Sequence, residues 1–330
     1  MGFRVGFRGK GVLAVGHILA DCIGSETAEL ADRLGGMASP VHVDSIFMGE
    51  LCDFLASSVR NLSWTAGGGA TNMAKAARGL GMDAEVWACA GRDERGDFLA
   101  AELAKAGISA HLTESDKPTG VFCSFAAQDG GRRIIVSQGA ARDIRGVEIP
   151  DVAFRRGWVL YIDGLLIDSL PWLKALAGKA KAKGMLVAMD LSTPGNAASQ
   201  AGKLAEFSAS FCDIVFANEK EFAALRNSLP RGSLPGEPQW VLKKGRRGAA
   251  LLSGGRMTEA PAVAIEAVDD TGAGDAFAAG YLGARMEGFS DMRCLQCGNA
   301  VASAAIMGRG SGFDAGRILK AYEVAFSNSI

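Results

Sequence analysis

The sequence predicts an α/β fold in which a doubly wound, mostly parallel sheet is flanked by helices. Short runs of almost continuous apolar residues recur along the chain, as in strands that are covered on both faces. Helix-like stretches separate these runs, and such an alternation is typical of parallel sheets with helices on both faces. The chain has 330 residues, 48% of them hydrophobic, which is enough for a sizeable core.

The elements of the predicted sheet follow one another in a regular order. The apolar runs that we interpret as strands are residues 11–16, 84–89, 158–162, 185–189, 213–217 and 240–242. The segments of helical spacing between them are residues 72–80, 98–105, 170–182 and 219–225. Further strand patterns at residues 263–265 and 267–268 lead directly into an apolar helix that includes Ala276 and Phe277.

Two stretches break this alternation. Residues 41–64 and 121–136 have a strand-like and hairpin-like pattern, the second with a turn at Asp129, Gly130 and Gly131. We therefore expect one domain over residues 1–330, in which segments at about 17–25, 41–65 and 111–137 form a small β lid.

Composition excludes several classes of function. The formal net charge is −1 and the isoelectric point is near 6.3, so neither nucleic acid nor an anionic membrane is an expected partner. No apolar run reaches transmembrane length and the first residues lack a signal core. The seven cysteines suit a reducing compartment, and Cys294 and Cys297 lack the second pair or histidines of a metal site. We expect a cytoplasmic protein. Residues 1–10 suggest no role.

The segment from Val268 to Phe277 joins a turn of small residues to the start of a helix. Glycines there let the backbone approach a ligand, and the free N–H groups of a first helical turn can bind a phosphate. Asp275 lies in that turn, where it could accept a proton from a substrate hydroxyl. An ordinary capped helix start is the alternative, because Asp and Gly are common there.

A second glycine cluster, Gly67 to Gly69, also precedes a helix. The apolar stripe of that helix is Met73, Ala76, Ala77 and Leu80, and Asn72 follows Gly69 by three residues. Three glycines alone would fit a flexible loop equally well.

The two clusters together resemble a known family. Asp269 to Phe277 is similar to the carboxy-terminal signature of the ribokinase-like, or PfkB, carbohydrate kinases, and Gly67 to Asn72 is similar to their amino-terminal signature. The resemblance implies a ribokinase-like fold with a small β lid, and an ATP-dependent kinase that acts on an alcohol hydroxyl. It also implies that Asp275 is the catalytic base, and that Gly272, Ala273 and Gly274 form an anion hole. Asp270 departs from the family, which usually has Thr or Pro there, and an extra carboxylate near phosphate is unfavourable unless it meets a cation.

The resemblance extends to the acceptor. It implies that Gly67, Gly68 and Asn72 contact substrate hydroxyls, and that Asp21 accepts hydrogen bonds from two of them. Asp93 matches a family stretch near the substrate, although a structural role in a strand-to-helix turn fits it equally well. His17, His42 and His111 have no catalytic or metal-ligand spacing, and only His17 is expected near the substrate.

For the nucleotide, the resemblance implies six further residues and a metal. Asn218 and Glu221 match an Asn-x-x-Glu motif, with Glu221 acting on Mg²⁺ through water. Lys244, Gly245 and Gly248 match a nucleotide loop, which is not a P-loop. Asn299, with a turn at residues 308–311, matches the adenine pocket.

The expected reaction is transfer of the γ-phosphate of ATP to a sugar or a sugar-like substrate. The long interval between Asp21 and Gly67 is reminiscent of the adenosine-kinase-like branch, so a nucleoside is the alternative acceptor. A non-catalytic sensor is a further alternative, whereas a dinucleotide oxidoreductase is disfavoured because Gly16 stands alone after the first strand. The family analogy adds a monovalent cation, such as K⁺, beside Asp269 and Thr271, and a homodimer through the lid.

Overall fold

A computed structural model describes residues 7–34, 40–58, 62–127, 131–230, 236, 238–308 and 312–327. Its larger sheet has the strand order β14-β13-β12-β11-β10-β9-β1-β5-β6. All neighbours are parallel except β12–β13 and β13–β14, which are antiparallel. In chain order the strands are β1 (Gly11–Val15), β5 (Asp83–Gly91), β6 (Ser109–Ser115), β9 (Val159–Asp163), β10 (Leu186–Asp190), β11 (Ile214–Asn218), β12 (Gln239–Lys243), β13 (Ala249–Ser253) and β14 (Arg256–Ala260).

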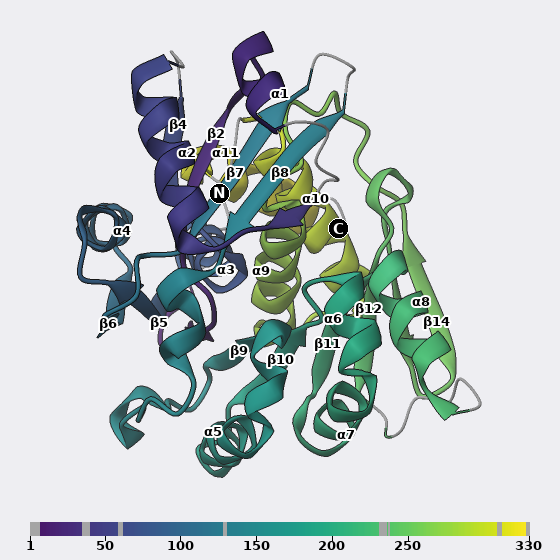
Figure 1. The fold of residues 1–330 in the computed structure, drawn as a ribbon. Helices are drawn as coiled ribbons and strands as arrows, with labels where there is room; N and C mark the ends of the chain where they lie inside the picture. The colour runs from purple at the N-terminus through teal and green to yellow at the C-terminus, as the bar shows by residue number, and fades with distance from the viewer. Residues whose placement is uncertain are drawn as a thin grey trace.

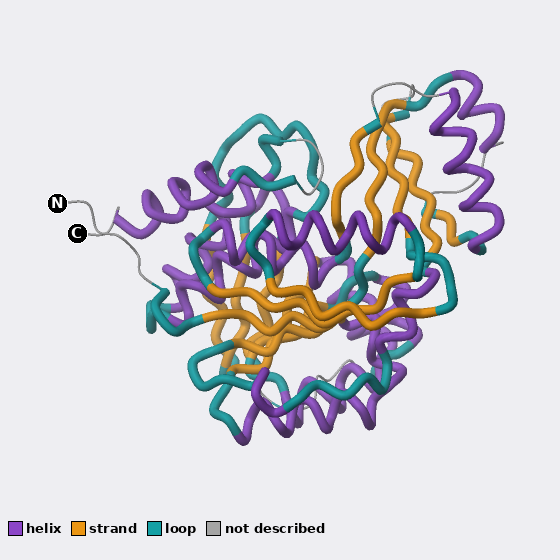
Figure 2. The backbone as a smooth tube through the Cα atoms, turned by 90° about the vertical axis from the view of Figure 1, so that its left-hand side faces the viewer, coloured by secondary structure: helices purple, strands orange, loops and turns teal. Residues whose placement is uncertain are grey.

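Helices cover both faces of this sheet (Figures 1 and 2). One layer consists of α3 (Gly69–Gly79), α9 (Ala273–Met286), α10 (Asp291–Ala305) and α11 (Ala315–Ser327). The other consists of α5 (Leu170–Ala182), α6 (Pro194–Ser199), α7 (Ala201–Phe211) and α8 (Glu219–Ser228). Helix α4 (Glu94–Lys105) packs against β6 and against β4 (Ser63–Gly67) of the second sheet.

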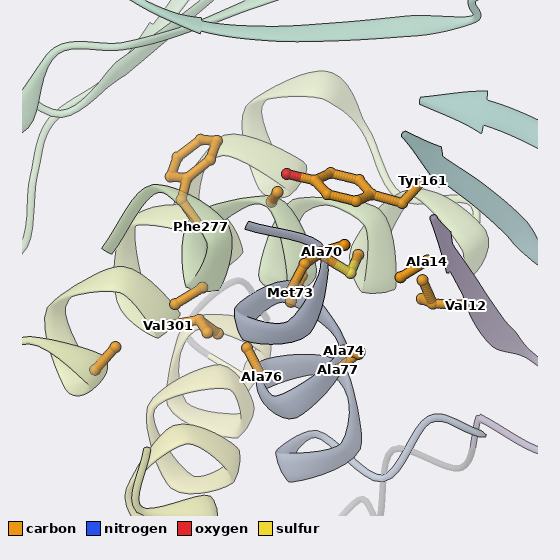
Figure 3. Close-up of a cluster of buried hydrophobic side chains, with 14 of the residues drawn as sticks. Val12, Ala14, Ala70, Met73, Ala74, Ala76, Ala77, Tyr161, Phe277 and Val301 are labelled. Carbon is orange, nitrogen blue, oxygen red and sulfur yellow. The ribbon is translucent and has the colours of Figure 1, made fainter. Parts of the chain in front are cut away.

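The alternation of side chains along β1 explains the two layers. Val12 and Ala14 belong to the core beneath α3 and α9, whereas Leu13 and Val15 belong to the core beneath α5 and α7. The alanines of α3 are small enough to bring this helix close to the sheet and to α9, with Met73 and Tyr161 filling the space between (Figure 3). This close packing brings together the starts of α3 and α9.

A second sheet stands at the carboxyl ends of the parallel strands, since β1 leads into it after a short connection (Figure 2). Its order is β3 (Val41–His42), β8 (Arg132–Ser137), β7 (Val121–Ala126), β2 (Leu19–Ser25) and β4 (Ser63–Gly67). Its outer face, with Cys22 and Cys123, packs against α1 (Ala28–Leu34) and α2 (Ser45–Ser58). A homodimer through the lid stays a prediction, and helices of the chain itself cover this face.

The predicted α/β class is confirmed, with its mostly parallel sheet and each predicted strand from residue 11 to 242. The strand-like interpretation of residues 41–64 is wrong in its middle, where Ser45–Ser58 forms a helix that buries Leu51 and Leu55. Residues 109–115 pair with β5 in the large sheet, so this part of the expected lid segment lies elsewhere.

The strand prediction at residues 263–268 is also wrong, because this segment is irregular and exposes Val263 and Val268. The predicted hairpin is formed by β7 and β8, and of its predicted turn at residues 129–131 only Gly131 lies within the described residues. The basic stretch at residues 1–10 is described only from Phe7 onward. Among the helices that the structure describes, none has the length and apolarity needed to cross a bilayer.

Candidate active site

The start of α9 turns on Gly272, which caps the helix with φ 75° in the left-handed region. A side chain at Gly272 would place its Cβ 2.8 Å from Cζ of Phe313, so conformation and space both require glycine. Ala273 and Gly274 follow in the first turn and are only half-buried. The N–H of Ala273 donates to the carbonyl of Asp270 at 3.2 Å, whereas that of Gly274 belongs to the first helical turn, whose N–H groups have no intrahelical acceptor and can bind an anion.

Asp275 is the third residue of α9 and accepts a hydrogen bond from Nδ2 of Asn72, at 3.2 Å. Desolvation and then the nearby Asp190 raise its pKa from 3.8 to about 8, while Lys243 and Asn72 act in the opposite direction. A carboxyl group with such a pKa can exchange a proton near neutral pH, as a general base must.

The start of α3 faces Asp275 from the opposite side. A Cβ at Gly69 would lie 3.6 Å from Oδ1 of Asp275, so the two helix starts are adjacent. Asp21 on β2 is 3% exposed, and its carboxylate packs directly on Gly67. A Cβ added at Gly67 would lie only 1.9 Å from Oδ2 of Asp21. Gly68 has φ 92° and packs on the carbonyl of His17. The structure thus brings Asp21, Gly67, Gly68 and Asn72 together beside Asp275.

Asp93 has a different environment. It caps α4, where Oδ1 accepts from the N–H of Gly96 at 2.9 Å and from the hydroxyl of Thr119 at 2.6 Å, while Oδ2 accepts from the N–H of Thr119 at 2.7 Å. Burial raises its pKa, but these hydrogen bonds outweigh burial and the net pKa lies below its ordinary value. Both carboxylate oxygens of Asp93 accept hydrogen bonds from within the chain, which supports the structural alternative, a role in a strand-to-helix turn.

Asn218 and Glu221 form a capping box at the start of α8. Nδ2 of Asn218 donates to Oε1 of Glu221 at 2.6 Å, and its backbone N–H donates to Oε2 at 2.7 Å. Glu221 is 3% exposed, and desolvation followed by Asp190 raises its pKa. A carboxylate has about four lone-pair sites, so Glu221 can still accept hydrogen bonds from metal-bound water.

This donor set fits Mg²⁺ held mainly by nucleotide phosphates, because Mg²⁺ keeps several waters in such sites. Among the described residues, no group of three or more His, Cys, Asp or Glu side chains is placed to hold a metal by itself.

The basic residue that enters the site is Lys243, not the predicted Lys244. Nζ of Lys243 lies 2.5 Å from Oδ2 of Asp190, and its side chain is 15% exposed. Lys244 pairs with Glu259 on β14, at 3.0 Å. Lys243 was overlooked because a run of basic residues is solvated by default. Strand alternation could have identified Lys243. Side chains two residues apart in a strand point to the same face, and Val241 is buried on the face that α9 covers.

Gly245 and Gly248 both have positive φ, at 58° and 91°. A Cβ at Gly248 would lie 2.1 Å from the carbonyl oxygen of Ala260, so this glycine lets the loop pack on the segment after β14. Asn299 holds the same segment, because its Nδ2 donates to the carbonyls of Ala260 and Pro261, at 3.2 and 2.9 Å. These two hydrogen bonds hold the backbone that follows β14 in place. The predicted turn at 308–311 is described only at Gly308.

A cleft of about 1020 Å³ separates these loops from the second sheet. The second sheet lines one side of it with Ile23, Ser124 and Arg132. The rest of the lining comes from the part of the chain around the larger sheet and includes Gly245, Val263, Ile265, Val268, Ala273, Asn299, Ser303 and Ile306. The lining reaches Ala273, two residues before Asp275, so the cleft leads to the start of α9.

Arg132 on β8 crosses the cleft to the signature turn. Its guanidinium donates to the carboxylate of Asp270 and, at 2.8 Å, to Oγ1 of Thr271, and it lies 3.3 Å from Oδ1 of Asp269. Asp270 therefore meets a cation, which accounts for its departure from the family pattern. A monovalent cation at Asp269 and Thr271 would compete with this guanidinium. No local pattern could have predicted the contact, because 138 residues separate Arg132 and Asp270.

His17 lies near the acceptor residues and bonds to Asp163, with Nδ1 2.8 Å from Oδ2. Burial raises the pKa of Asp163, but His17, Ser192 and the N–H of Leu165 outweigh burial and bring it down to about 2. The ionised Asp163 thus fixes the orientation of the His17 ring.

Comparison with known proteins agrees with this geometry. The family model of the pfkB family carbohydrate kinases matches residues 51–315. An ATP-dependent ribose-1-phosphate kinase of Halopiger xanaduensis is 27% identical over 249 residues, covering 74% of this chain and 81% of the relative. A nucleoside kinase of Methanothermobacter thermautotrophicus is 25% identical over 301 residues, covering 89% and 88%.

Solved structures show the same fold. An adenosine kinase from Sinorhizobium meliloti superposes with a TM-score of 0.82 at 24% identity, covering 96% of this chain and 99% of the other. A probable sugar kinase from Rhizobium etli gives 0.81 at 25% identity, covering 96% and 98%. The chain belongs to the pfkB family of carbohydrate kinases, and it is a phosphotransferase whose acceptor is an alcohol group.

Proposed function

We propose that this kinase transfers the γ-phosphate of ATP to a hydroxyl of a nucleoside, with Asp275 as general base. The observation that carries the proposal is the hydrogen bond between Asp275 and Asn72, which joins the helix start of the signature turn to the helix start beside Asp21. The acceptor hydroxyl would lie between them. Its proton would pass to Asp275 while its oxygen attacks the γ-phosphorus in line with the leaving ADP.

The N–H groups of the α9 start would stabilise the phosphoryl group in transfer. Gly272 and Gly274 carry no side chains that would keep an anion from these amides. When bound with ATP, Mg²⁺ would neutralise phosphate charge. Glu221 would hold its water ligands, and Asn218 keeps the Glu221 carboxylate in place.

The adenine of ATP would lie on the far side of the cleft. Val263 and Val268 there are 48% and 59% exposed, and both line the cleft with Ile306. Apolar side chains exposed along a cleft suit the flat faces of a purine. Asn299 would act indirectly, by holding the segment after Ala260 in place.

The inner face of the second sheet favours a nucleoside over a small sugar. Phe122 and Val136 pair in register with each other, and Phe122 pairs with Asp21, so all three lie on one face. Ile23 lies on the same face and lines the cleft. An acceptor whose ribose hydroxyls meet Asp21 would thus place an apolar base on these side chains, whereas a free sugar would leave them without a partner.

The test is a panel of acceptors in a coupled assay of ADP release, with the phosphorylated product identified by mass spectrometry. Adenosine, other nucleosides, ribose, ribose 1-phosphate and ketoses are compared at equal concentration. We expect the highest kcat/KM with a nucleoside. Transfer to sugars but to no nucleoside would contradict the proposed acceptor, and it would remain consistent with Asp275 as the general base. Binding of acceptors without transfer to any of them would favour a non-catalytic sensor.

A further inference from the structure

We propose that Lys243 is a catalytic residue whose ammonium group contacts the phosphoryl group during transfer. The inference rests on the proposed function and adds a second source of positive charge to the anion hole. Lys243 is the last residue of β12 and pairs in register with Asn218 at the end of β11. Its side chain therefore starts from the carboxyl edge of the parallel sheet, where the site lies.

The ammonium group lies against the anion-hole backbone. A Cβ at Gly274 would lie 3.0 Å from Nζ of Lys243 and 3.5 Å from its Cδ. Lys243 thus occupies the space beside the first turn of α9, whose N–H groups are the proposed anion donors. An anion bound to those amides would lie within reach of the ammonium.

The surrounding charges keep Lys243 protonated. Burial opposes its charge, but Asp190, Glu221 and Asp275 outweigh burial, so that its pKa lies above the ordinary value. An ammonium has three donors, and the described contacts use one of them, on Asp190. The remaining donors can bond the oxygens of a phosphoryl group. Asp190 acts as a positioning residue, because its carboxylate holds Nζ at 2.5 Å.

The chemistry assigns Lys243 no proton transfer. The acceptor hydroxyl loses its proton to Asp275, the acceptor oxygen forms a bond to phosphorus, and the bond between the γ-phosphorus and the bridging oxygen breaks with its electron pair remaining on ADP. Negative charge spreads over the three equatorial oxygens during this step. A fixed ammonium stabilises that charge more than the ground state, which raises kcat.

A structural role is the rival explanation, in which Lys243 merely neutralises Asp190. Three variants separate the two roles. Lys243→Met removes the charge and keeps the length of the side chain. Asp190→Asn combined with Lys243→Met also removes the carboxylate that a structural lysine would neutralise. Lys181→Met is the matched control, because Lys181 also lies 2.5 Å from a carboxylate, that of Asp213, on the helix layer away from the site.

We expect Lys243→Met to lower kcat by roughly 10²- to 10³-fold, the scale seen when one donor to a developing oxyanion is lost. ATP binding, measured by calorimetry, should change little, and Lys181→Met should behave as wild type. The double variant should stay as slow as Lys243→Met, since neither has the ammonium. Recovery of kcat in the double variant, or a normal kcat in folded Lys243→Met, would overturn the proposal.

A second measurement makes the inference independent of the acceptor. Aluminium fluoride with ADP and Mg²⁺ mimics the phosphoryl group in transfer, and its trapping can be followed without turnover. Lys243→Met should trap this complex much more weakly than wild type while ADP alone binds equally well. Equal trapping would contradict the role of Lys243. A wild type that traps the complex but phosphorylates no acceptor would contradict the proposed function and leave Lys243 in place.

Discussion

The starts of α3 and α9 look alike in sequence and differ in what surrounds them. Both have a glycine with positive φ as N-cap, at 92° for Gly68 and 75° for Gly272. The first turn of α3 buries Ala70 and Thr71 completely and meets the carboxylate of Asp21 near Gly67. The first turn of α9 is half-buried and has cationic neighbours in Lys243 and Arg132, the latter through the preceding turn.

The difference shows that glycines before a helix provide access to backbone, whereas neighbouring side chains decide what binds. Asp21 can only accept hydrogen bonds, which suits hydroxyl groups. The cations beside α9 suit phosphate. We therefore assign the acceptor to α3 and the phosphoryl group to α9, and the following experiments test that division.

The largest effect is expected for Asp275→Asn. The amide keeps the shape of the side chain but cannot accept the hydroxyl proton, so kcat should fall by about 10²- to 10⁴-fold while ATP still binds. The same change should raise Tm near neutral pH, because it removes a carboxyl group whose ionisation the folded site disfavours. Near-normal turnover by folded Asp275→Asn would exclude it as the base.

Gly272→Ala should damage phosphoryl transfer selectively. A Cβ there is strained at φ 75° and would lie 2.8 Å from Phe313, so the first turn of α9 must shift. We expect kcat to fall about 10- to 100-fold, the scale of donor misplacement, with the acceptor KM nearly unchanged. Gly81→Ala is the control, because Gly81 has φ 93° with no atom within 4 Å of the added Cβ. It should lose stability without losing kcat.

Gly67→Ala should do the opposite. The added Cβ would overlap the carboxylate of Asp21, with atoms at 1.9 to 2.2 Å, so Asp21 must turn away from its position. The acceptor KM should rise by about tenfold or more, since a hydrogen bond to a charged group contributes about 1.5–3 kcal/mol. The KM for ATP should stay the same. A rise in both constants would break the division between the two helix starts.

The pH dependence of kcat/KM for ATP tests the state of Asp275. Its pKa of about 8 makes the ionised base scarce at pH 6, so kcat/KM should rise toward pH 8 and level off above it. Burial raises this pKa most, Asp190 and Asp163 raise it further, and Lys243 and Asn72 lower it. A flat profile from pH 6 to 9, measured by ADP release, would contradict this prediction.

Stability should change with pH in the opposite sense. Below 3.8 both the folded and the unfolded chain keep the proton on Asp275, and this group has no effect. Between 3.8 and about 8 the unfolded chain has lost the proton and the folded chain retains it, so the contribution to stability falls as pH rises. Wild type should therefore lose Tm relative to Asp275→Asn over this window, as thermal unfolding in parallel buffers can measure.

Sequence predicted the parts of the fold that depend on local patterns. The apolar runs identified every parallel strand of the large sheet except β6, and the glycines identified both helix starts, because backbone conformation depends on neighbouring residues. The helix over Ser45–Ser58 was missed because its apolar residues are only weakly gathered on one face. The burial of Leu51 and Leu55 comes from packing against the second sheet, which the local sequence does not show. Lys243 was missed because its burial depends on the packing of α9 over β12, and such tertiary contacts leave no local pattern.

The smallest effects should come from the contact between Arg132 and the signature turn, which exists only on the α9 side. The Asp270 side chain is 77% exposed, and such ion pairs contribute about 0–1 kcal/mol, so Asp270→Thr should leave kcat and Tm close to wild type. Arg132→Gln should have a larger effect, because Arg132 also bonds Thr271 and Ser124 and lies 3.3 Å from Asp269. It removes the guanidinium that lies beside the Asp269 carboxylate, whose side chain is 9% exposed. A monovalent cation could then bind there, so we expect activation by KCl over NaCl in Arg132→Gln and little activation in wild type or Asp270→Thr. Strong activation of wild type by KCl would show that Arg132 does not take the place of the cation.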